Sequence, residues 1–518
     1  MFRPRLSSIV IGALLVSNIV INTSPVQAAP SDGRIDTSFG TSGFTTTSIG
    51  DDGLSHSIAV DSQGRIIAGG YAFFGGVIKF TIARYTANGI LDTSFGTAGL
   101  NTTTPGTEGD EMFSIALDSQ DRVIAGGYVT IGGANKFAVA RYTSSGVLDT
   151  TFGTAGFNTS TTGTSDFIQT IAIDSQGRII AGGFATIGGA SKFAVARYTS
   201  SGILDTTFGT AGFTTTTIGA HAAIATIAFD SQGRIIAGGR ADIGGAQKFA
   251  VARYTSSGIL DTTFGTAGFN TTSLGTVADE IISIALDSQE RIIAGGQAII
   301  EGICRFILAR YTSSGILDTS FGTSGFTTTT PGTFDAISDI VLDSQERIIA
   351  GGLASDAGPS KFVLARYTRS GVLDSTFGTS GFITTTLDNP GSNIRSIALD
   401  SQGRVIAGGR VSRGGIESKF AIARYLLTAN PDPEAIAAQA AATAEAARVA
   451  AANAEAARKA KEQQELREIL ALIPSIGELT LSLGETTQSL YSTKCVKGKT
   501  TKYVKYGAKC PKGYVKKK

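Results

Sequence analysis

The chain has no tryptophan, two methionines, two histidines and three cysteines among its 518 residues. A Ser-His-Asp apparatus or a histidine-rich zinc site would have to be built from His56 and His221 alone, so the sequence offers little material for either. No GxGxxG or P-loop pattern stands between a strand and a helix, which leaves nucleotide binding without its usual motif. Proline is also sparse, at 11 residues, whereas glycine reaches 66, and this composition favours many short strands joined by tight turns.

Charge is distributed unevenly along the chain. The formal net charge is +2, but ten lysines and no acidic residue lie between Lys494 and Lys518, so the rest of the chain carries a charge of −8. Apolar residues make up 42% of the chain, which is enough for a large core. The sequence therefore predicts a mildly acidic globular body with a local basic end.

Residues 1–29 are predicted to be a signal peptide. Arg3 and Arg5 form a basic start, SSIVIGALLVSNIVI supplies an apolar stretch, and Val26-Gln27-Ala28 offers a small-residue cleavage site. An uncleaved anchor helix is the alternative, but two asparagines interrupt the apolar run and Pro25 follows it. We therefore expect an exported protein that is secreted, extracellular or associated with the cell envelope.

A repeat of 56 or 57 residues dominates the chain between residues 30 and 427. Each copy has a DSQxR motif, an AGG triplet, a glycine-containing loop and a [KR]FxxARY segment, in that order. The motif LDxxFG, with IDTSFG at Ile35 as its first copy, also occurs seven times. The DSQxR copies begin at Asp61, Asp118, Asp174, Asp230, Asp287, Asp343 and Asp400.

Each repeat predicts four antiparallel strands. SIALDSQGRIIAGG reads as two β-branched runs around a tight turn, in which the aspartate side chain accepts hydrogen bonds from nearby backbone N–H groups. KFAVARY alternates large and small side chains as a strand packed on both faces would, and the threonine-rich GFTTTT supplies a fourth strand. Four strands in about 56 residues are typical of a propeller blade.

The two ends of the array are complementary, which favours a closed ring over an open solenoid. The array begins at Ile35 with the last-strand element alone and ends at Tyr425 with the first three strands alone. An open solenoid would need atypical capping units, whereas these ends can complete one blade and remove exposed sheet edges. We therefore predict an all-β, seven-bladed β-propeller at residues 30–427, in which an N-terminal strand closes the last blade.

The segments DSQGRIIAGG, KFAVARY and LDTTFGTAGF resemble the bacterial delta-60 repeat family of secreted β-propellers, and more distantly the NHL type of blade. The resemblance implies the propeller fold. It implies no activity, because that family has no general one to carry over.

The residues that recur in every copy are interpreted as structural. A ring has one axis but seven copies of each such residue. The aspartate of DSQxR is predicted to form a turn, the arginine of ARY to pair with the aspartate of LDxxFG or to cap carbonyl groups, and the AGG glycines to permit close packing of blades. The two histidines lie before first strands, where we expect solvated loop positions.

The stretches before the first strands are rich in carboxylates. If each first strand lines the axis, these side chains would gather around the channel mouth, where they could hold a calcium ion or attract a basic partner. Ordinary solubilising loop charge is the alternative, because no DxDxDG spacing accompanies them. The predicted ligand-binding residues are Asp51, Asp110, Glu111, Asp166, Asp279, Glu280 and Asp335, with Asp52 and Asp388 in the same stretches.

The cysteines divide into a pair and a single residue. Cys495 and Cys510 flank a short lysine- and tyrosine-rich segment of an exported chain, so a disulfide is predicted between them. Cys304 takes a position held by asparagine, serine or glutamine in most other copies, which predicts a partly exposed free thiol.

Two further regions follow the ring. Residues 428–474 are predicted to be a helical spacer. Within them, residues 433–473 are rich in Ala, Glu, Arg, Lys and Gln and predict a helix about 60 Å long, at about 1.5 Å per residue, that acts as a spacer or, alternatively, as a dimerisation rod. Residues 475–518 end in STKCVKGKTTKYVKYGAKCPKGYVKKK, which resembles a short lysine- and cysteine-rich cassette at the C-terminus of bacterial exported proteins. Lys494–Lys518 could bind an envelope polyanion, although a merely solvated tail is the alternative.

These observations favour a non-enzymatic binding scaffold. Its propeller face would contact a glycan or a protein, its basic tail would tether it to the envelope, and we expect a monomer without a nucleic-acid partner or a cofactor. The alternative is an extracellular polysaccharide hydrolase or lyase that uses loop carboxylates at the channel mouth. The near-uniformity of the copies favours the scaffold.

Overall fold

The computed structural model describes residues 33–106, 109–274, 278–356, 358–387, 391–413, 417–427, 492–505 and 508–517, together with Arg448, Glu455 and Lys459. The chain divides into two compact units, residues 1–432 and 433–518. The predicted signal peptide lies outside the described residues. So does the predicted helix, except at Arg448, Glu455 and Lys459, which are helical. No helix in the described part of the chain is long and apolar enough to cross a membrane.

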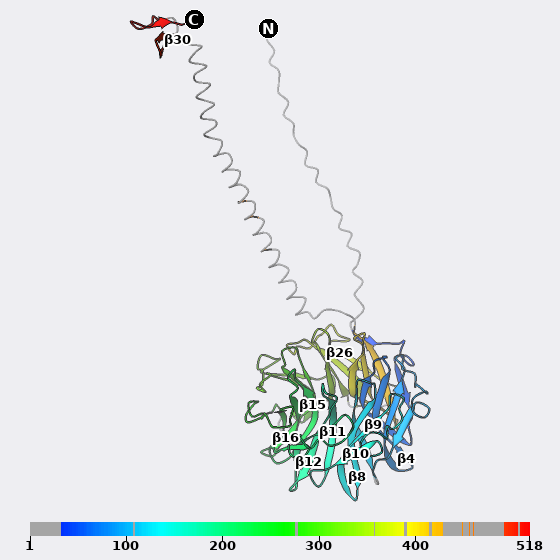
Figure 1. Cartoon of the computed structure of the whole chain (residues 1–518). Coiled ribbons are helices and arrows are strands. Elements are labelled where there is room, and N and C mark those ends of the chain that lie inside the picture. The colour runs from blue at the N-terminus through cyan, green and yellow to red at the C-terminus, as the bar shows by residue number, and fades with distance from the viewer. Residues whose placement is uncertain are drawn as a thin grey trace, which may run out of the picture. The chain divides into compact units, whose positions relative to one another are not determined.

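The first unit contains six continuous four-stranded antiparallel sheets, which are the blades (Figure 1). Blade 1 has β3 (Asp52–Val60), β4 (Ile66–Phe74), β5 (Val77–Tyr85) and β6 (Leu100–Thr103); blade 2 has β7 (Asp110–Leu117), β8 (Val123–Ile131), β9 (Ala134–Tyr142) and β10 (Phe157–Ser160); blade 3 has β11 (Asp166–Ile173), β12 (Ile179–Ile187), β13 (Ala190–Tyr198) and β14 (Phe213–Thr216). Blade 4 has β15 (Ala222–Phe229), β16 (Ile235–Ile243), β17 (Ala246–Tyr254) and β18 (Phe269–Thr272); blade 5 has β19 (Asp279–Leu286), β20 (Ile292–Ile300), β21 (Ile303–Tyr311) and β22 (Phe326–Thr329); blade 6 has β23 (Phe334–Leu342), β24 (Ile348–Ser355), β25 (Lys361–Tyr367) and β26 (Phe382–Thr385).

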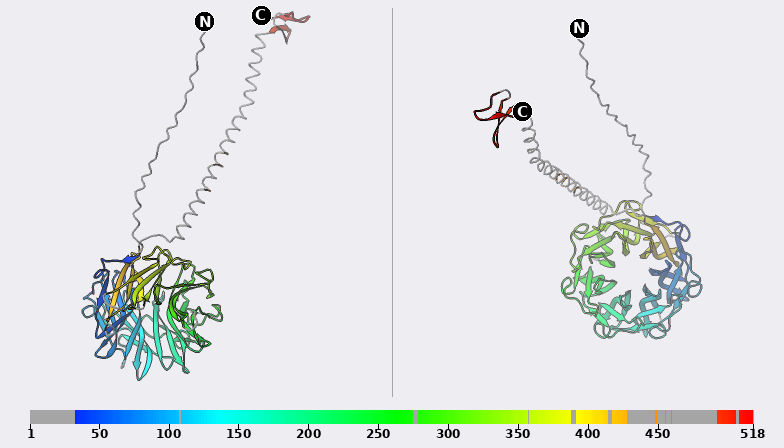
Figure 2. Two further views of the ribbon diagram at one scale, coloured as in Figure 1. Left: turned by 180° about the vertical axis from the view of Figure 1, so that it is seen from behind. Right: turned by 45° about the horizontal axis from the view of Figure 1, so that its top comes forward.

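Blade 7 is assembled from both ends of the ring. It has β27 (Ser392–Leu399), β28 (Val405–Arg413) and β29 (Glu417–Leu426), and β29 pairs in addition with β1 (Arg34–Ile35) and β2 (Phe44–Thr47). Ile35 lies opposite Tyr425, and Phe44 lies opposite Ala423. The predicted completion of the last blade by the N-terminal element is thus found in the structure, and Figure 2 shows the blades in a closed circle.

The core consists of clusters between neighbouring blades. The cluster that joins blade 7 to blade 1 includes Phe39, Ile58, Ile406 and Phe420, all 6% exposed or less. The other joints repeat this arrangement. Because every blade buries its faces against two neighbours, the hydrophobic core continues around the ring.

The repeated residues have the structural roles that the sequence predicted. Asp61 accepts hydrogen bonds from the backbone N–H groups of Gln63 (3.0 Å) and Arg65 (2.8 Å), which fixes the DSQxR turn. In the AGG triplet of blade 2, a Cβ on Gly126 would lie 2.3 Å from Cγ2 of Ile171 in blade 3, and one on Gly127 would lie 2.0 Å from the carbonyl oxygen of Glu111. Glycine therefore permits close approach both between blades and within a blade.

Each first strand contains a β-bulge, and hydrogen bonds next to the bulges link neighbouring blades around the axis. In β11 the register shifts between Ile168 and Thr170, so Gln169 has no partner on β12. In five blades, the residue that follows the bulge carries a side-chain oxygen that accepts a hydrogen bond from a backbone N–H group of the next blade. In each case the backbone N–H of an isoleucine donates to a side-chain oxygen of the preceding blade. The donor–acceptor pairs are Ile115 and Ser57 (3.2 Å), Ile171 and Ser114 (3.1 Å), Ile284 and Thr226 (3.4 Å), Ile340 and Ser283 (3.3 Å), and Ile397 and Asp339 (2.8 Å).

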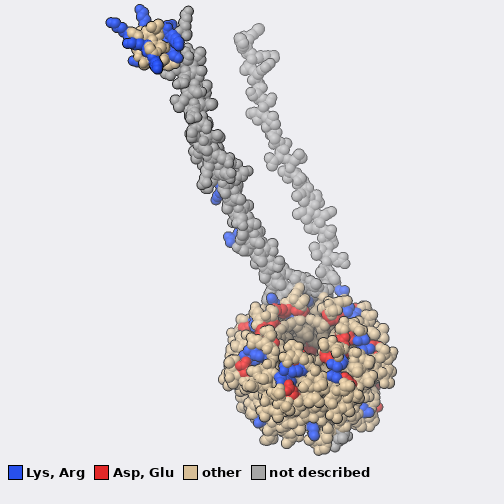
Figure 3. All heavy atoms as spheres, viewed as in Figure 1, with Lys and Arg blue, Asp and Glu red and all other residues tan. Residues whose placement is uncertain are grey.

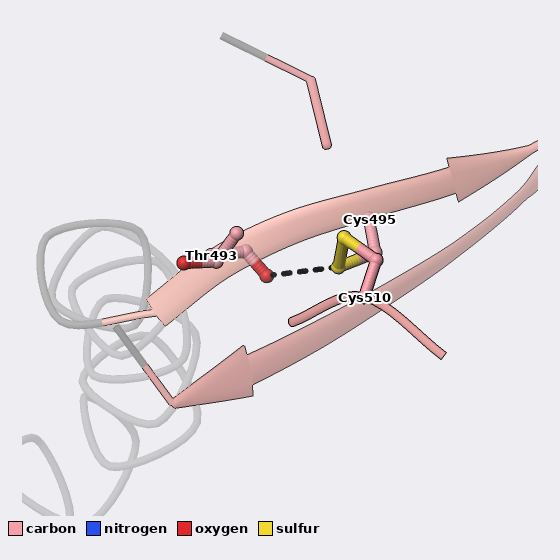
Figure 4. Close-up of a disulfide and its surroundings, with 3 residues drawn as sticks. All are labelled: Thr493, Cys495 and Cys510. Carbon is pink, nitrogen blue, oxygen red and sulfur yellow. Dashed lines mark hydrogen bonds between the residues drawn. A yellow bond between two sulfur atoms is a disulfide. The ribbon is translucent and has the colours of Figure 1, made fainter. Parts of the chain in front are cut away.

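The second unit contains a small sheet in the order β31-β30-β32, with β30 (Ser492–Lys497), β31 (Thr500–Lys505) and β32 (Val515–Lys516). The predicted disulfide joins Cys495 to Cys510, whose Cα atoms are 5.6 Å apart (Figure 4). The Cys495 sulfur lies 3.7 Å from the carbonyl oxygen of Thr493, a contact rather than a hydrogen bond because a disulfide sulfur carries no proton. Lys494 lies over the ring of Tyr503, 5.7 Å from its centroid. A disulfide thus stabilises a sheet too small to have a core of its own.

Candidate functional site

Three positions of each blade vary although the framework around them repeats. One is the bulged residue of the first strand, five positions before the aspartate of DSQxR. In ring order these residues are His56, Phe113, Gln169, Ala225, Ile282, Ser338 and Arg395. All seven differ, although the isoleucine two positions later is the same in every blade.

The other two variable positions face each other across the first two strands. One lies seven positions before the DSQxR aspartate and the other directly follows AGG, and the structure pairs them in register, as in Glu111 with Tyr128. The pairs are Leu54 and Tyr71, Glu111 and Tyr128, Phe167 and Phe184, Ala223 and Arg240, Glu280 and Gln297, Ala336 and Leu353, and Asn393 and Arg410. Variation at these positions, on strands that otherwise largely repeat, indicates that they help to distinguish one blade from another.

A cavity of about 590 Å³ lies on the axis, and all seven bulged residues line it. Its walls come from all seven first strands and include His56, Phe113 and Arg395. The space-filling view shows the ring hollowed at its centre, with acidic and basic side chains on the rim of the hollow (Figure 3). The variable positions therefore surround a concave site, which is the usual form of a ligand site.

An aromatic row crosses blades 1 to 3. The ring centroids of His56 and Phe113 are 4.9 Å apart, those of Phe113 and Tyr128 are 6.0 Å apart, and Tyr128 and Phe167 follow at 4.6 Å. Phe167 stacks on Phe184 at 4.7 Å. Tyr71 contacts His56, and Phe73 contacts Tyr71 in turn; we call these two residues and the five above the aromatic row.

The aromatic row connects two cavities. His56 and Phe113 line the axial cavity, whereas Phe184 lines a second pocket of about 140 Å³ together with His221 and Arg240. The rings of the row are partly exposed. They can therefore contact a ligand that extends from one cavity to the other.

Glu111 and His56 form the polar centre of the row. His56 Nε2 lies 3.2 Å from Glu111 Oε1, and the hydroxyl of Tyr128 donates to Glu111 Oε2 at 3.2 Å. Burial lowers the pKa of His56, against the opposing effect of Glu111, so the imidazole is neutral at pH 7. Burial and the charge of Glu111 raise the pKa of Tyr128 to about 12. The expectation of a solvated loop histidine is wrong for His56, whose side chain is 14% exposed in β3, but holds for the exposed His221.

The predicted exposed ring of carboxylates is not what the structure contains. Asp110, Asp166, Asp279 and Asp335 are 1% exposed or less. They lie one position before the channel-facing residues, and because strand side chains alternate between faces, they point into the joint between blades. They hold the preceding loops: Asp166 Oδ2, for example, accepts the N–H groups of Thr162 (2.7 Å) and Gly163 (3.0 Å). Burial raises the pKa of Asp110 and raises that of Asp335 to about 6.

The remaining carboxylates that were predicted to bind a ligand do not lie together with these buried aspartates. Glu111 and Glu280 do lie on the variable face, where Glu280 forms an ion pair with Arg240. Asp51 is exposed and accepts the N–H of Gly75 at 2.9 Å, and Asp388 lies outside the described residues. Among the residues that the structure describes, no group of three or more His, Cys, Asp or Glu side chains could hold a metal ion, so the calcium prediction finds no ligand set there.

The solvent exposure of Cys304 differs from the prediction. It is 6% exposed, not partly exposed, and burial raises the pKa of its thiol to about 11. A buried thiol of this kind is a poor nucleophile.

Comparison with known families supports the repeat assignment. Six segments match the family model described as "Domain of unknown function (DUF5122) beta-propeller", at residues 62–95, 121–152, 175–208, 231–264, 291–321 and 347–377. Each begins in or just after a DSQxR turn and ends in or just after the LDxxFG motif. The chain is thus a β-propeller repeat protein, and the matches support its assignment to a bacterial β-propeller repeat family. No curated protein matches the chain.

Solved structures resemble the chain at low sequence identity. A protein of unknown function from Dyadobacter fermentans DSM 18053 is 9% identical over 74% of this chain and 99% of that one, with a TM-score of 0.37. The polysaccharide lyase Uly1 is 10% identical over 78% and 94%, with a TM-score of 0.42. A gluconolactonase from Xanthomonas campestris is 11% identical over 77% and 99%, with a TM-score of 0.31. Similarity at this level carries no argument about activity.

Proposed function

We propose that the protein is a binding scaffold that acts outside a bacterial cell as a monomer, and that its aromatic row binds a glycan chain. The observation that carries the proposal is the row itself: seven rings in mutual contact, built almost entirely from the variable positions of an otherwise uniform repeat. Repeat proteins place ligand contacts on variable positions of a constant framework. The predicted signal peptide and the resemblance to delta-60 repeat proteins support the extracellular location.

The chemistry of the row suits sugar rings. A pyranose has an apolar face of C–H groups, which packs against the electron-rich face of an aromatic ring, and an edge of hydroxyl groups, which needs hydrogen-bonding partners. The row supplies both, because Glu111 and His56 lie among its rings. A slender chain fits better than a folded protein, since the rings are recessed and only partly exposed.

Binding to polysaccharides tests this function. We expect affinity electrophoresis against neutral and uronic-acid polysaccharides to identify a ligand. The double variant Tyr128→Ala with Phe167→Ala should then weaken binding by about 30-fold or more, because aromatic anchors that a ligand covers each contribute about 1 kcal/mol or more to such sites. Ile203→Ala is the control: Ile203 is an exposed apolar side chain of blade 3 that lines neither cavity. Unchanged retardation of the double variant would contradict the proposal, as would failure of every polysaccharide to bind.

The basic C-terminal segment is proposed to tether the protein to envelope polyanions. Lys494, Lys497, Lys499, Lys502 and Lys505 lie on or between the strands of a small disulfide-bonded sheet, where they concentrate positive charge. Its resemblance to the cassette of exported proteins supports this role. Fractionation of producing cells should find the full chain with the envelope and a chain without residues 475–518 in the medium, whereas equal release of both would remove the tether.

The enzymatic alternative is less well supported. Hydrolysis of a glycosidic bond usually needs two carboxyl groups that flank it. The burial of Asp110 and Asp279 leaves Glu111 and Glu280 without the adjacent carboxylates that the sequence suggested. We therefore favour the function of a binding scaffold over that of a hydrolase or lyase.

A further inference from the structure

Blade 7 carries two arginines on the variable face, next to the aromatic row. Arg395 is the bulged residue of β27 and lines the axial cavity. Arg410 follows the AGG triplet on β28, opposite Asn393. Blade 7 borders blade 1, where the row begins with His56 and Tyr71.

No acidic side chain in the described part of the chain forms an ion pair with either arginine, in contrast to the arginines of the ARY and DSQxR motifs. The arginine of each ARY motif pairs with an LDxxFG aspartate, and Arg240 on the same variable face pairs with Glu280. Glu111, the nearest carboxylate of the row, is engaged by His56 and Tyr128. Burial by the channel wall and the charge of Arg410 lower the pKa of Arg395. Glu111 is a weaker opposing influence on Arg395 and forms no ion pair with it, so two neighbouring positive charges without an ion-pair partner favour an anion from outside the chain.

Asn393 adds an independent observation. It is 5% exposed, lies on the wall of the axial cavity, and its Oδ1 accepts no hydrogen bond from any residue that the structure describes. A buried acceptor without a donor is costly, so a ligand hydroxyl that donates to it would gain the corresponding free energy.

We propose that Arg395, Arg410 and Asn393 form a subsite for a negatively charged sugar, whose carboxylate or sulfate binds the two guanidinium groups while a hydroxyl donates to Asn393. The inference rests on the proposed glycan binding and specifies its ligand class: an anionic polysaccharide whose next sugar rings pack on His56, Tyr71 and Phe113. Guanidinium groups suit this role because their planar N–H donors match carboxylate and sulfate oxygens.

Matched polysaccharide pairs test the subsite. Polygalacturonate and alginate are each compared with the carboxyl-reduced neutral polymer of the same backbone, and dextran sulfate with dextran, by affinity electrophoresis and titration calorimetry on the full chain. The wild-type protein should bind the anionic member of at least one pair about 10-fold or more tightly than the neutral member. The carboxylate and sulfate pairs identify which anion is bound.

Substitutions then locate the charge preference. Arg395→Ala with Arg410→Ala should abolish the preference, so that the anionic member binds no more tightly than the neutral member of the same pair. Arg240→Ala, which removes an arginine already paired with Glu280, should retain the preference. Thermal unfolding of each variant verifies that the ring is folded.

The outcomes separate the two proposals. Equal affinity of the wild-type protein for both members of every pair that binds would overturn the subsite alone. A preference that survives the double arginine variant would overturn it as well. Binding of neither member of any pair would overturn the proposed glycan binding, and the subsite with it.

Discussion

A chain that lacks residues 33–47 should lose more than about 5 kcal/mol of its free energy of unfolding and should self-associate. The segment supplies β1, β2, the fully buried Phe39 and the Asp36 partner of Arg424, whose Nε donates to Asp36 Oδ2 at 2.7 Å. Loss of a buried phenylalanine costs about 3–5 kcal/mol, and an unpaired buried arginine costs about as much. The exposed edge of β29 would then pair with other chains. Denaturant titration and size-exclusion chromatography measure both effects.

A circular permutant is the matched control. In the other blades the ARY tyrosine leads through TSSG-like residues directly to LDxxFG, and Gly33 has the same backbone conformation as Gly202, with φ of 79° and 81°. The permutant runs from residue 48 to Tyr425, through Thr-Ser-Ser, to residues 33–47 and then to residues 428–518. Its free energy of unfolding should lie within about 1 kcal/mol of the wild-type value, because it keeps every native strand and replaces only Leu426 at the end of β29. A deletion variant as stable as the permutant would show that the ring does not depend on this closure.

Arg197→Ala should destabilise the ring by about 3–5 kcal/mol, which is the typical cost of breaking a buried ion pair. Arg197 is 5% exposed and donates to Asp205 Oδ2 (2.8 Å), to the carbonyl oxygen of Ser256 in the next blade (2.6 Å) and to Thr207 (3.1 Å). It also lies over the ring of Phe208. Arg197→Lys should recover only part of the loss, because an ammonium group cannot make this planar set of bonds.

Arg178→Ala is the control for the Arg197 variants. Arg178 pairs with Asp174 within one DSQxR turn and its side chain is 25% exposed, so its loss should cost about 1 kcal/mol or less of the free energy of unfolding.

The hydrogen bond from Thr207 and the pairing with Arg197 lower the pKa of Asp205. Because the pKa of Asp205 is lower in the folded state than in the unfolded state, its ionised form stabilises the fold at pH values above the unfolded-state pKa. This contribution is lost as the pH falls through the folded-state pKa, so the stabilities of the arginine variants should be compared at pH 7. Equal destabilisation by Arg197→Ala and Arg178→Ala would contradict the structural role of the ARY arginine.

Much of the fold could be predicted because the repeat supplies seven observations of each local pattern. The DSQxR turn, the pairing of the ARY arginine with an aspartate and the completion of the last blade at Ile35 and Tyr425 all follow from motif order and residue chemistry. The disulfide between Cys495 and Cys510 was also predictable, from two cysteines in a segment too small to form a hydrophobic core.

The site was harder to predict because neighbouring residues of a strand face opposite ways. Asp110 and Glu111 are adjacent, yet one is buried under a loop and the other contacts His56. A bulge that no single motif reveals adds a further reversal of direction at Phe113. The useful signal was a column-by-column comparison of the repeats, in which the position of His56 and Arg395 differs in every copy.

The bulges have a consequence for how such a protein can diversify. A residue outside the backbone ladder, such as Phe113, can be exchanged without disturbing any strand pair, while the hydroxyl of the next residue, Ser114, still holds the adjacent blade. Duplication of a repeat gene segment would therefore copy the scaffold intact, and later point mutations at one codon per copy would be enough to give the pore a new chemical lining.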